Sequence, residues 1–185
     1  MSIPRLNLVV AICNNNGIGI NGSLPWKLRK DMDFFKTITM TTSDPEKQNA
    51  VIMGRKTWQS IPENFRPLRN RINIILSRDM NSAPDGTHVA RSLPDALSLL
   101  STEELADRVE NIHIIGGSSV YQEAMTGSYP CRLYLTRILA DFECDAFLPE
   151  IDDSSFTKIR NPDNVPTDLH EENGLKFRFE VYDKL

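Results

Sequence analysis

Ile112-His113-Ile114-Ile115-Gly116-Gly117-Ser118-Ser119-Val120-Tyr121 is the stretch from which the fold of this chain can best be inferred. Residues 112–115 form an apolar run typical of a buried strand, and a helical pattern over 119–125 follows the two glycines. Paired glycines let a backbone approach a ligand closely, and a helix start offers free N–H groups to a phosphate. The same pattern also suits a plain strand-to-helix turn. The stretch therefore predicts a strand–helix unit and leaves phosphate binding as a hypothesis.

Similar apolar runs lie on both sides of this unit, with helical patterns between several of them. The runs are Leu6–Cys13, Ala50–Met53, Ile72–Leu76, Leu133–Ile138 and Phe177–Tyr182, and the helical patterns are Leu28–Thr39 and Pro94–Leu100, the latter with Ser92 as its cap. Solidly apolar runs that alternate with helices predict a mostly parallel sheet covered on both faces. The last two runs alternate between apolar and polar residues, which indicates antiparallel pairing near a sheet edge. We therefore predict an α/β fold in a single domain, residues 1–185, with a polar surface loop over Glu150–Asn173.

Composition narrows the possible function classes. The net charge of −4 argues against nucleic acid and against an anionic membrane as the main partner. The apolar run near the N-terminus is too short for a membrane span and lacks the layout of a signal peptide. The cysteines, Cys13, Cys131 and Cys144, are odd in number and lack C-x-x-C spacing, which favours reduced thiols in the cytoplasm over a disulfide framework. We expect no metal site, because neither the cysteines nor the histidines show ligand spacing.

Asp31 has an unusual position on the first predicted helix. At about 100° per residue, it falls on the side that also carries Phe34, Phe35 and Ile38. A carboxylate on an apolar helix face must find a partner or give up its charge. The partner could be a buried Arg or Thr in a purely structural pair, or the acid could serve a reaction.

A glycine-rich segment precedes this helix. Gly17-Ile18-Gly19-Ile20-Asn21-Gly22 matches the G-x-G-x-x-G pattern of dinucleotide-binding proteins. That pattern requires a helix to open at its last glycine, whereas Pro25 disfavours helical geometry just beyond it. We therefore interpret the segment as a flexible loop that could close over a ligand.

Basic residues follow three of the expected strands. They are Arg55 and Lys56 after Met53, Arg78 after Leu76, and Arg91 after the region of His88 to Ala90. In open α/β sheets, ligands bind beyond the carboxyl ends of the strands. Each of these residues alone could be ordinary surface charge, but together they favour a dinucleotide with an extra phosphate, such as NADP.

These motifs together resemble the dihydrofolate reductase family from about Leu6 to Tyr182. The residues that carry the resemblance are Gly17-Ile18-Gly19, Leu24-Pro25-Trp26, Ile52-Met53-Gly54-Arg55-Lys56-Thr57-Trp58, Arg71-Ile72-Asn73, Leu76-Ser77-Arg78, Ile115-Gly116-Gly117-Ser118-Ser119-Val120-Tyr121 and Leu135-Thr136-Arg137. The length resembles the eukaryotic branch. The acid after Trp26, however, is an Asp at short spacing, as in bacterial members.

The resemblance implies a mainly parallel eight-stranded sheet flanked by about four helices, and the reduction of 7,8-dihydrofolate to tetrahydrofolate with NADPH. It further implies a role in one-carbon metabolism, inhibition by antifolates, and a cytoplasmic monomer. The implied catalytic residues are Asp31, Leu24, Trp26 and Thr136. The implied substrate-binding residues are Val9, Val10, Ala11, Asp31, Met32, Phe35, Ser60, Ile61, Phe65, Leu68, Arg71, Ile115, Tyr121 and Thr136. The implied cofactor-binding residues are Ala11, Ile18, Gly19, Gly54, Arg55, Lys56, Thr57, Leu76, Ser77, Arg78, Arg91, Ser92, Ile115, Gly116, Gly117, Ser118, Ser119, Val120 and Tyr121.

By the same resemblance, Asp31 would bind the pterin and Thr136 would steady it. Burial should raise the pKa of Asp31, and a hydrogen bond from Thr136 should partly counter that. Cis peptide bonds are expected at Arg66-Pro67 and Gly116-Gly117. Two alternatives remain: a reductase domain of riboflavin synthesis, which shares the architecture and NADPH, and a noncatalytic module that binds a dinucleotide or folate.

Overall fold

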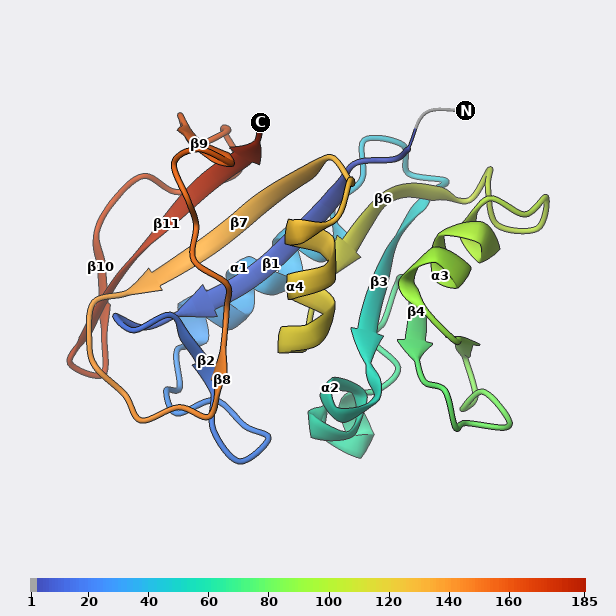
Figure 1. Ribbon diagram of the computed structural model, residues 1–185, viewed down its shortest axis with the longest axis horizontal. Coiled ribbons are helices and arrows are strands. Elements are labelled where there is room, and N and C mark those ends of the chain that lie inside the picture. Colours follow the sequence, from blue (N-terminus) through green and yellow to red (C-terminus); the bar gives the residue numbers. More distant parts are fainter. Residues whose placement is uncertain (1–2) are drawn as a thin grey trace.

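The computed structural model describes residues 3–185, which form a mixed sheet flanked by helices (Figure 1). The strands are β1 (Leu6–Ile12), β2 (Gly17–Gly19), β3 (Gln48–Gly54), β4 (Arg71–Leu76), β5 (Thr87–Ala90), β6 (Val109–Ile114), β7 (Cys131–Ile138), β8 (Ala146–Phe147), β9 (Phe156–Ile159), β10 (His170–Glu172) and β11 (Leu175–Lys184). The helices are α1 (Arg29–Met40), α2 (Arg55–Ser60), α3 (Leu93–Leu100) and α4 (Ser118–Thr126), with a 3-10 turn at Glu63–Phe65.

The main sheet has the continuous order β10-β11-β7-β1-β6-β3-β4-β5, and β9 also pairs with β11. Strands β7, β1, β6, β3, β4 and β5 run parallel to one another, because helices and loops carry the chain back between them. β11 lies antiparallel to β7, β9 and β10. The predicted α/β class, with its parallel centre and antiparallel C-terminal edge, is confirmed. β2 and β8 form a separate two-stranded sheet, so residues Gly17–Gly19 of the segment interpreted as a flexible loop are a strand, held by pairing with a distant part of the chain.

Helices cover the two faces of the sheet, α4 in front and α1 behind in Figure 1. On the α4 face, Leu8, Ile52 and Ile114 are fully buried in the largest core cluster. On the α1 face, Phe34 of the helix stacks on Phe179 of β11, with ring centroids 4.2 Å apart. Each strand of the centre therefore contributes apolar side chains to both faces, as its nearly solid apolar sequence indicates.

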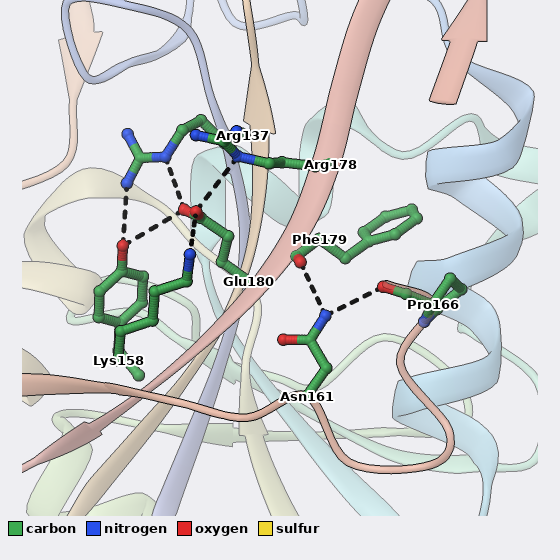
Figure 2. Close-up of polar contacts among 8 residues, drawn as sticks. Arg137, Lys158, Asn161, Pro166, Arg178, Phe179 and Glu180 are labelled. Atoms are coloured by element: carbon green, nitrogen blue, oxygen red, sulfur yellow. Dashed lines mark hydrogen bonds and ion pairs between the residues drawn. The ribbon is translucent and has the colours of Figure 1, made fainter. Parts of the chain in front are cut away.

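An ion cluster on the outer part of the sheet joins β7, β9 and β11 (Figure 2). The carboxylate of Glu180 is buried and pairs with Arg137 at 2.6 Å, Lys158 at 3.0 Å and Arg178 at 3.3 Å. Burial opposes its charge, but the hydrogen bonds from Arg137 and Lys158 hold the pKa of Glu180 below its ordinary value. The three cations compensate a buried carboxylate that would oppose folding if it were left unpaired.

The polar segment Glu150–Asn173 differs from the prediction of a surface loop, since it contains β9 and β10. Both strands are short and pair with β11. Because β11 is longer than either of them, it has backbone groups that can pair with both. The helix α2 was also not predicted, because its six residues are too few to show a helical period. Among residues 3–185, no helix combines the length and the apolar character that crossing a bilayer requires.

Candidate active site

The first turn of α1 positions Asp31. The helix begins at Arg29, one residue later than predicted, because Leu28 has an extended backbone. The carboxylate of Glu172, from β10, accepts hydrogen bonds from the N–H groups of Arg29 at 2.6 Å and Lys30 at 3.0 Å. A residue far away in the sequence therefore caps this helix, and it orients the turn that carries Asp31.

Thr136 is the partner of Asp31. Its hydroxyl, buried on β7 beside Ala11 of β1, donates a hydrogen bond of 2.6 Å to Oδ1 of Asp31. Burial raises the pKa of Asp31 to about 6, the Thr136 hydroxyl lowers it, and the nearby charge of Glu172 raises it. The pKa of Asp31 therefore shifts upward as expected, with burial raising it and the Thr136 hydrogen bond partly countering the rise. A carboxyl with a pKa near neutrality can hold or release a proton under working conditions.

The apolar stripe of α1 divides between core and surface. Phe34 and Ile38 are buried against the sheet, whereas Phe35 is partly buried and Met32 is 63% exposed. Asp31 is also partly buried. The helix thus carries one carboxylate and two apolar side chains outside the fully buried core, a combination that suits a flat ring with a polar edge.

The C-terminal part of β1 lies beside Asp31 and Thr136. The side chain of Val9 packs in the α1 core, but that of Val10 packs in the α4 core, so Val10 offers only its backbone on the α1 side of the sheet. The hydroxyl of Tyr121 donates to the carbonyl of Val9 at 2.8 Å. Complete burial, together with the charge of Asp31, raises the pKa of Tyr121, so this hydroxyl stays protonated.

Leu24 and Trp26 precede α1 and differ in exposure. Leu24 is 55% exposed, whereas Trp26 is buried and packs edge-on against Phe142 with ring centroids 5.5 Å apart. The indole N–H of Trp26 is buried and finds no hydrogen-bond partner among residues 3–185. A buried donor of this kind normally meets a water molecule or a ligand.

Arg71 is the first residue of β4 and lies beside the C-terminal end of α1. Its Nη1 donates to Oγ1 of Thr39 at 3.0 Å, and its Nε donates to the carbonyl of Arg69 at 2.9 Å. Asn73 holds the preceding turn, because its side chain bonds both the N–H and the carbonyl of Leu68 at 2.9 Å. These bonds leave Nη2 of Arg71 available for a carboxylate.

The segment between α2 and β4 combines exposed and partly buried apolar residues. Phe65 is 64% exposed on the 3-10 turn, and Ser60 is exposed at the end of α2. Ile61 and Leu68 are partly buried against a third core cluster that contains Trp58 and Ile115. The exposed aromatic ring and the apolar residues behind it offer a surface for a flat apolar group.

The two glycines after β6 lie against the start of α2. The peptide bonds Gly116-Gly117 and Arg66-Pro67 are both cis, as expected. Gly116 has a φ of 132°, its carbonyl accepts a hydrogen bond of 2.8 Å from Gly54, and an added Cβ would lie 3.1 Å from Oγ1 of Thr57. Only glycine suits this conformation, which brings the backbone beside Thr57.

Two helix N-termini meet at this point, since α2 follows β3 and α4 follows the neighbouring strand β6. Within residues 3–185, no side chain caps α2 or α4, whereas Ser92 caps α3 by accepting a 3.2 Å bond from the N–H of Asp95. The uncapped N–H groups are free to bind an anion. The predicted cap at Ser92 is confirmed.

The basic residues expected near a dinucleotide extend along the same sheet edge. Arg55, Lys56, Arg78 and Arg91 are exposed, and Arg91 donates from Nη1 to the carbonyl of Ser77 at 2.9 Å. The hydroxyl of Ser77 accepts bonds from the N–H groups of Asp79 at 3.2 Å and Met80 at 3.1 Å. Arg91 therefore lies against the strand end that precedes Arg78.

The comparisons with known proteins agree with this geometry. The family model described as dihydrofolate reductase matches residues 5–184. The chain belongs to the dihydrofolate reductase family. Over 184 residues it is 51% identical to the dihydrofolate reductase of Sus scrofa, which covers 98% of this chain and 99% of that one. Over 185 residues it is 46% identical to that of Aedes albopictus, with 99% of both chains covered.

A solved structure of Schistosoma mansoni dihydrofolate reductase superposes with a TM-score of 0.88 at 48% identity, covering 98% of this chain and 99% of that one. The resemblance inferred from the sequence motifs is therefore confirmed. This chain is an oxidoreductase of the dihydrofolate reductase family, and the family implies a nicotinamide cofactor.

Sequence reasoning missed several residues that position the site in this family member. Asn49, on β3, is buried and donates to the carbonyls of Thr39 at 3.1 Å and Thr41 at 2.9 Å, which fixes the end of α1 beside Arg71. Glu172 caps α1, and Asn73 holds the turn that precedes Arg71. Asn73 interrupts the apolar run Ile72–Leu76, and that interruption was the available signal, whereas Asn49 lies just before the run Ala50–Met53. Glu172 lies in the segment predicted as a loop, and no local pattern marked it.

Proposed function

We propose that this chain reduces 7,8-dihydrofolate to 5,6,7,8-tetrahydrofolate with NADPH as the reductant. Reduction of dihydrofolate is the reaction of the family to which the chain belongs. The observation that carries the assignment to a site is the largely buried Asp31 carboxyl, which Thr136 holds by a hydrogen bond and whose pKa is raised to about 6. The product supplies one-carbon metabolism, and antifolates would occupy the same site.

In this proposal, Asp31 binds the polar edge of the pterin. Its two oxygens accept from the 2-amino group and the neighbouring ring nitrogen, while Met32, Phe35, Ile61 and Leu68 contact the ring faces. Phe65 and Ser60 lie at the rim. The backbone of Val10 and the side chains of Val9 and Ala11 line the floor.

The chemistry requires a proton at N5 of the pterin, because C6 accepts a hydride readily only when N5 is protonated. NADPH supplies the hydride. Asp31 cannot touch the 2-amino edge and N5 at once, so its charge favours the cationic pterin while a water near Leu24 and Trp26 delivers the proton. The unpartnered indole N–H of Trp26 supports a water at that place.

The residues at the other strand ends fit a dinucleotide. The uncapped starts of α2 and α4 suit its pyrophosphate, and the Gly116-Gly117 cradle permits a close approach of backbone to ligand. Arg78 and Arg91 lie where a 2′-phosphate would select NADPH over NADH. Ile18, Gly19, Leu76, Ser77 and residues Ile115–Tyr121 complete the proposed contacts.

In this proposal, Arg71 recognises the glutamate tail of dihydrofolate. Thr39 and the Arg69 carbonyl orient its guanidinium, so a free edge faces outward to pair with the α-carboxylate. We further propose that residues 1–185 form one domain that works as a monomer. The three free cysteines support a reducing compartment such as the cytoplasm.

The decisive experiment follows the absorbance of NADPH after dihydrofolate is added to the purified chain. We expect a loss of absorbance that requires both compounds and is almost absent in Asp31→Asn. Asp33→Asn, on the exposed face of the same helix, is the matched control. Binding of both compounds without turnover would favour a noncatalytic module, and turnover of a riboflavin precursor instead would favour the other reductase class.

A further inference from the structure

Two cysteines that sequence spacing did not connect lie in contact. The sulfurs of Cys13 and Cys144 are 3.9 Å apart, although 131 residues separate them in the chain. Cys13 follows β1 and is 1% exposed, whereas Cys144 precedes β8 and is partly exposed. One thiol is therefore within reach of a small reagent, and the other lies directly behind it.

Gly17 makes this approach possible. A Cβ added at Gly17 would lie 2.4 Å from the sulfur of Cys144, so any other residue would displace that side chain. Asn15 accepts hydrogen bonds from the thiol of Cys13 at 3.0 Å and from the N–H of Gly17 at 3.1 Å. The turn between β1 and β2 thus holds Cys13 on one side and leaves room for Cys144 on the other.

Hydrogen bonds connect the same two segments around the thiols. The N–H of Asp145 donates to the carbonyl of Gly19 at 3.0 Å, and the N–H of Leu148 donates to that of Asn16 at 2.9 Å. The carboxylate of Asp145 accepts from the N–H of Asn21 at 3.0 Å. The glycine-rich loop therefore docks on residues 144–148 through contacts that are partly exposed and individually weak.

We propose that Cys13 and Cys144 form a redox-active dithiol, which a peroxide converts into an intramolecular disulfide that ties the glycine-rich loop to residues 144–148. The thiolate of Cys144 attacks one oxygen of the peroxide, gives a sulfenic acid and releases water. The thiolate of Cys13 then attacks that sulfenic sulfur and releases the second water. Two thiols lose two electrons and two protons, and hydrogen peroxide is reduced to two waters.

The geometry needs only a local adjustment. The sulfurs must move from 3.9 Å to about 2.05 Å, and each can turn toward the other about its own Cα–Cβ bond because the cysteine side chain is short and unbranched. Burial and the hydrogen bond with Cys13 raise the pKa of the Cys144 thiol, so little thiolate is present at neutral pH and the oxidation should become faster as pH rises.

Cys131 provides an internal control. It is buried on β7, and its thiol donates to the carbonyl of Ala124 at 3.1 Å, away from the other two cysteines. Burial also raises the pKa of Cys131 to about 11, and its sulfur, unlike that of the partly exposed Cys144, is shielded from a reagent in solution. Replacement of Cys131 should therefore leave the proposed chemistry unchanged.

The test treats the purified full chain with hydrogen peroxide and measures intact mass, free thiols and thermal unfolding. We expect a loss of two hydrogens, a fall from three free thiols to one, and a peptide that joins Cys13 to Cys144. The disulfide should raise Tm by about 5 °C, because it constrains the unfolded chain, and dithiothreitol should reverse the change. Cys131→Ser should behave like the parent, whereas Cys13→Ser and Cys144→Ser should gain no intramolecular disulfide.

Three results would overturn the proposal. They are retention of three thiols, addition of oxygen without a Cys13–Cys144 peptide, and disulfides that form only between chains. A Cys13–Cys144 disulfide that leaves Tm unchanged would overturn the tethering of the loop. None of these measurements depends on turnover, so they stand apart from the test of the proposed function.

Discussion

The hydroxyl of Thr136 donates to the carboxylate of Asp31 across 2.6 Å, although the two residues are 105 positions apart. Burial makes Asp31 a weaker acid, and this hydrogen bond makes it a stronger one, so their balance sets a pKa of about 6. The balance can be changed from either side by a single substitution.

Thr136→Val should raise the pKa of Asp31, because it removes the hydrogen bond that favours the charged form. We expect the pH dependence of hydride transfer, measured in single turnovers, to shift upward by about one pH unit. Thr126→Val, at the exposed end of α4, should leave the profile unchanged. An unshifted profile in Thr136→Val would show that this bond does not control the ionisation.

Asp31→Asn should reduce hydride transfer at neutral pH by about 100-fold or more, because the site loses the charge that favours a protonated pterin. Binding of NADPH should persist. Much of the rate should return at low pH, where the substrate is already protonated. Stopped-flow absorbance measures the rate, and parental activity in Asp31→Asn would remove this acid from the mechanism.

The raised pKa of Asp31 should also make the folded chain less stable as pH rises. Since this pKa is about 6 in the folded chain and 3.8 when unperturbed, the folded state holds more protons between these values. The free energy of unfolding should therefore fall between about pH 4 and pH 6, by up to about 3 kcal/mol. Urea unfolding of parent and Asp31→Asn measures this, and the variant should be the more stable of the two at pH 7. Parallel stability curves would contradict the raised pKa.

Arg71→Lys should weaken binding of dihydrofolate by about 10- to 100-fold, because an ammonium cannot form the paired hydrogen bonds of a guanidinium. A dihydropterin without the glutamate tail should bind parent and variant equally. Arg69→Lys, in the same turn, serves as the control. Equal losses for both ligands would assign Arg71 to the structure of the turn rather than to the carboxylate.

Arg78→Gln should weaken NADPH about 10- to 100-fold while leaving NADH nearly unaffected, since only NADPH carries the extra phosphate. Fluorescence titration of both cofactors measures the ratio. Arg160→Gln removes an exposed positive charge on the segment between β9 and β10 and should change neither affinity. If the ratio of the two affinities stays constant in Arg78→Gln, this residue does not read the 2′-phosphate.

Local sequence patterns were sufficient for most of the architecture. Periodicity identified the main strands, the helices α1, α3 and α4, and the antiparallel character of β11. It failed for α2, β2, β8, β9 and β10, because segments of two to six residues carry too little pattern. Asp31 stood out because its place on an apolar helix face is a local property of residues 28–38.

By itself, then, the amino-acid sequence determined where apolar and polar residues alternate, which segments are buried and which acid requires a partner. Tertiary structure alone decided that Glu172 caps α1, that Asn49 fixes the end of α1 beside Arg71, and that Cys13 contacts Cys144. Patterns along the chain report contacts within a few residues, whereas these contacts join positions brought together only when the strands pair. Their geometry depends on sheet order and register, which no single segment encodes.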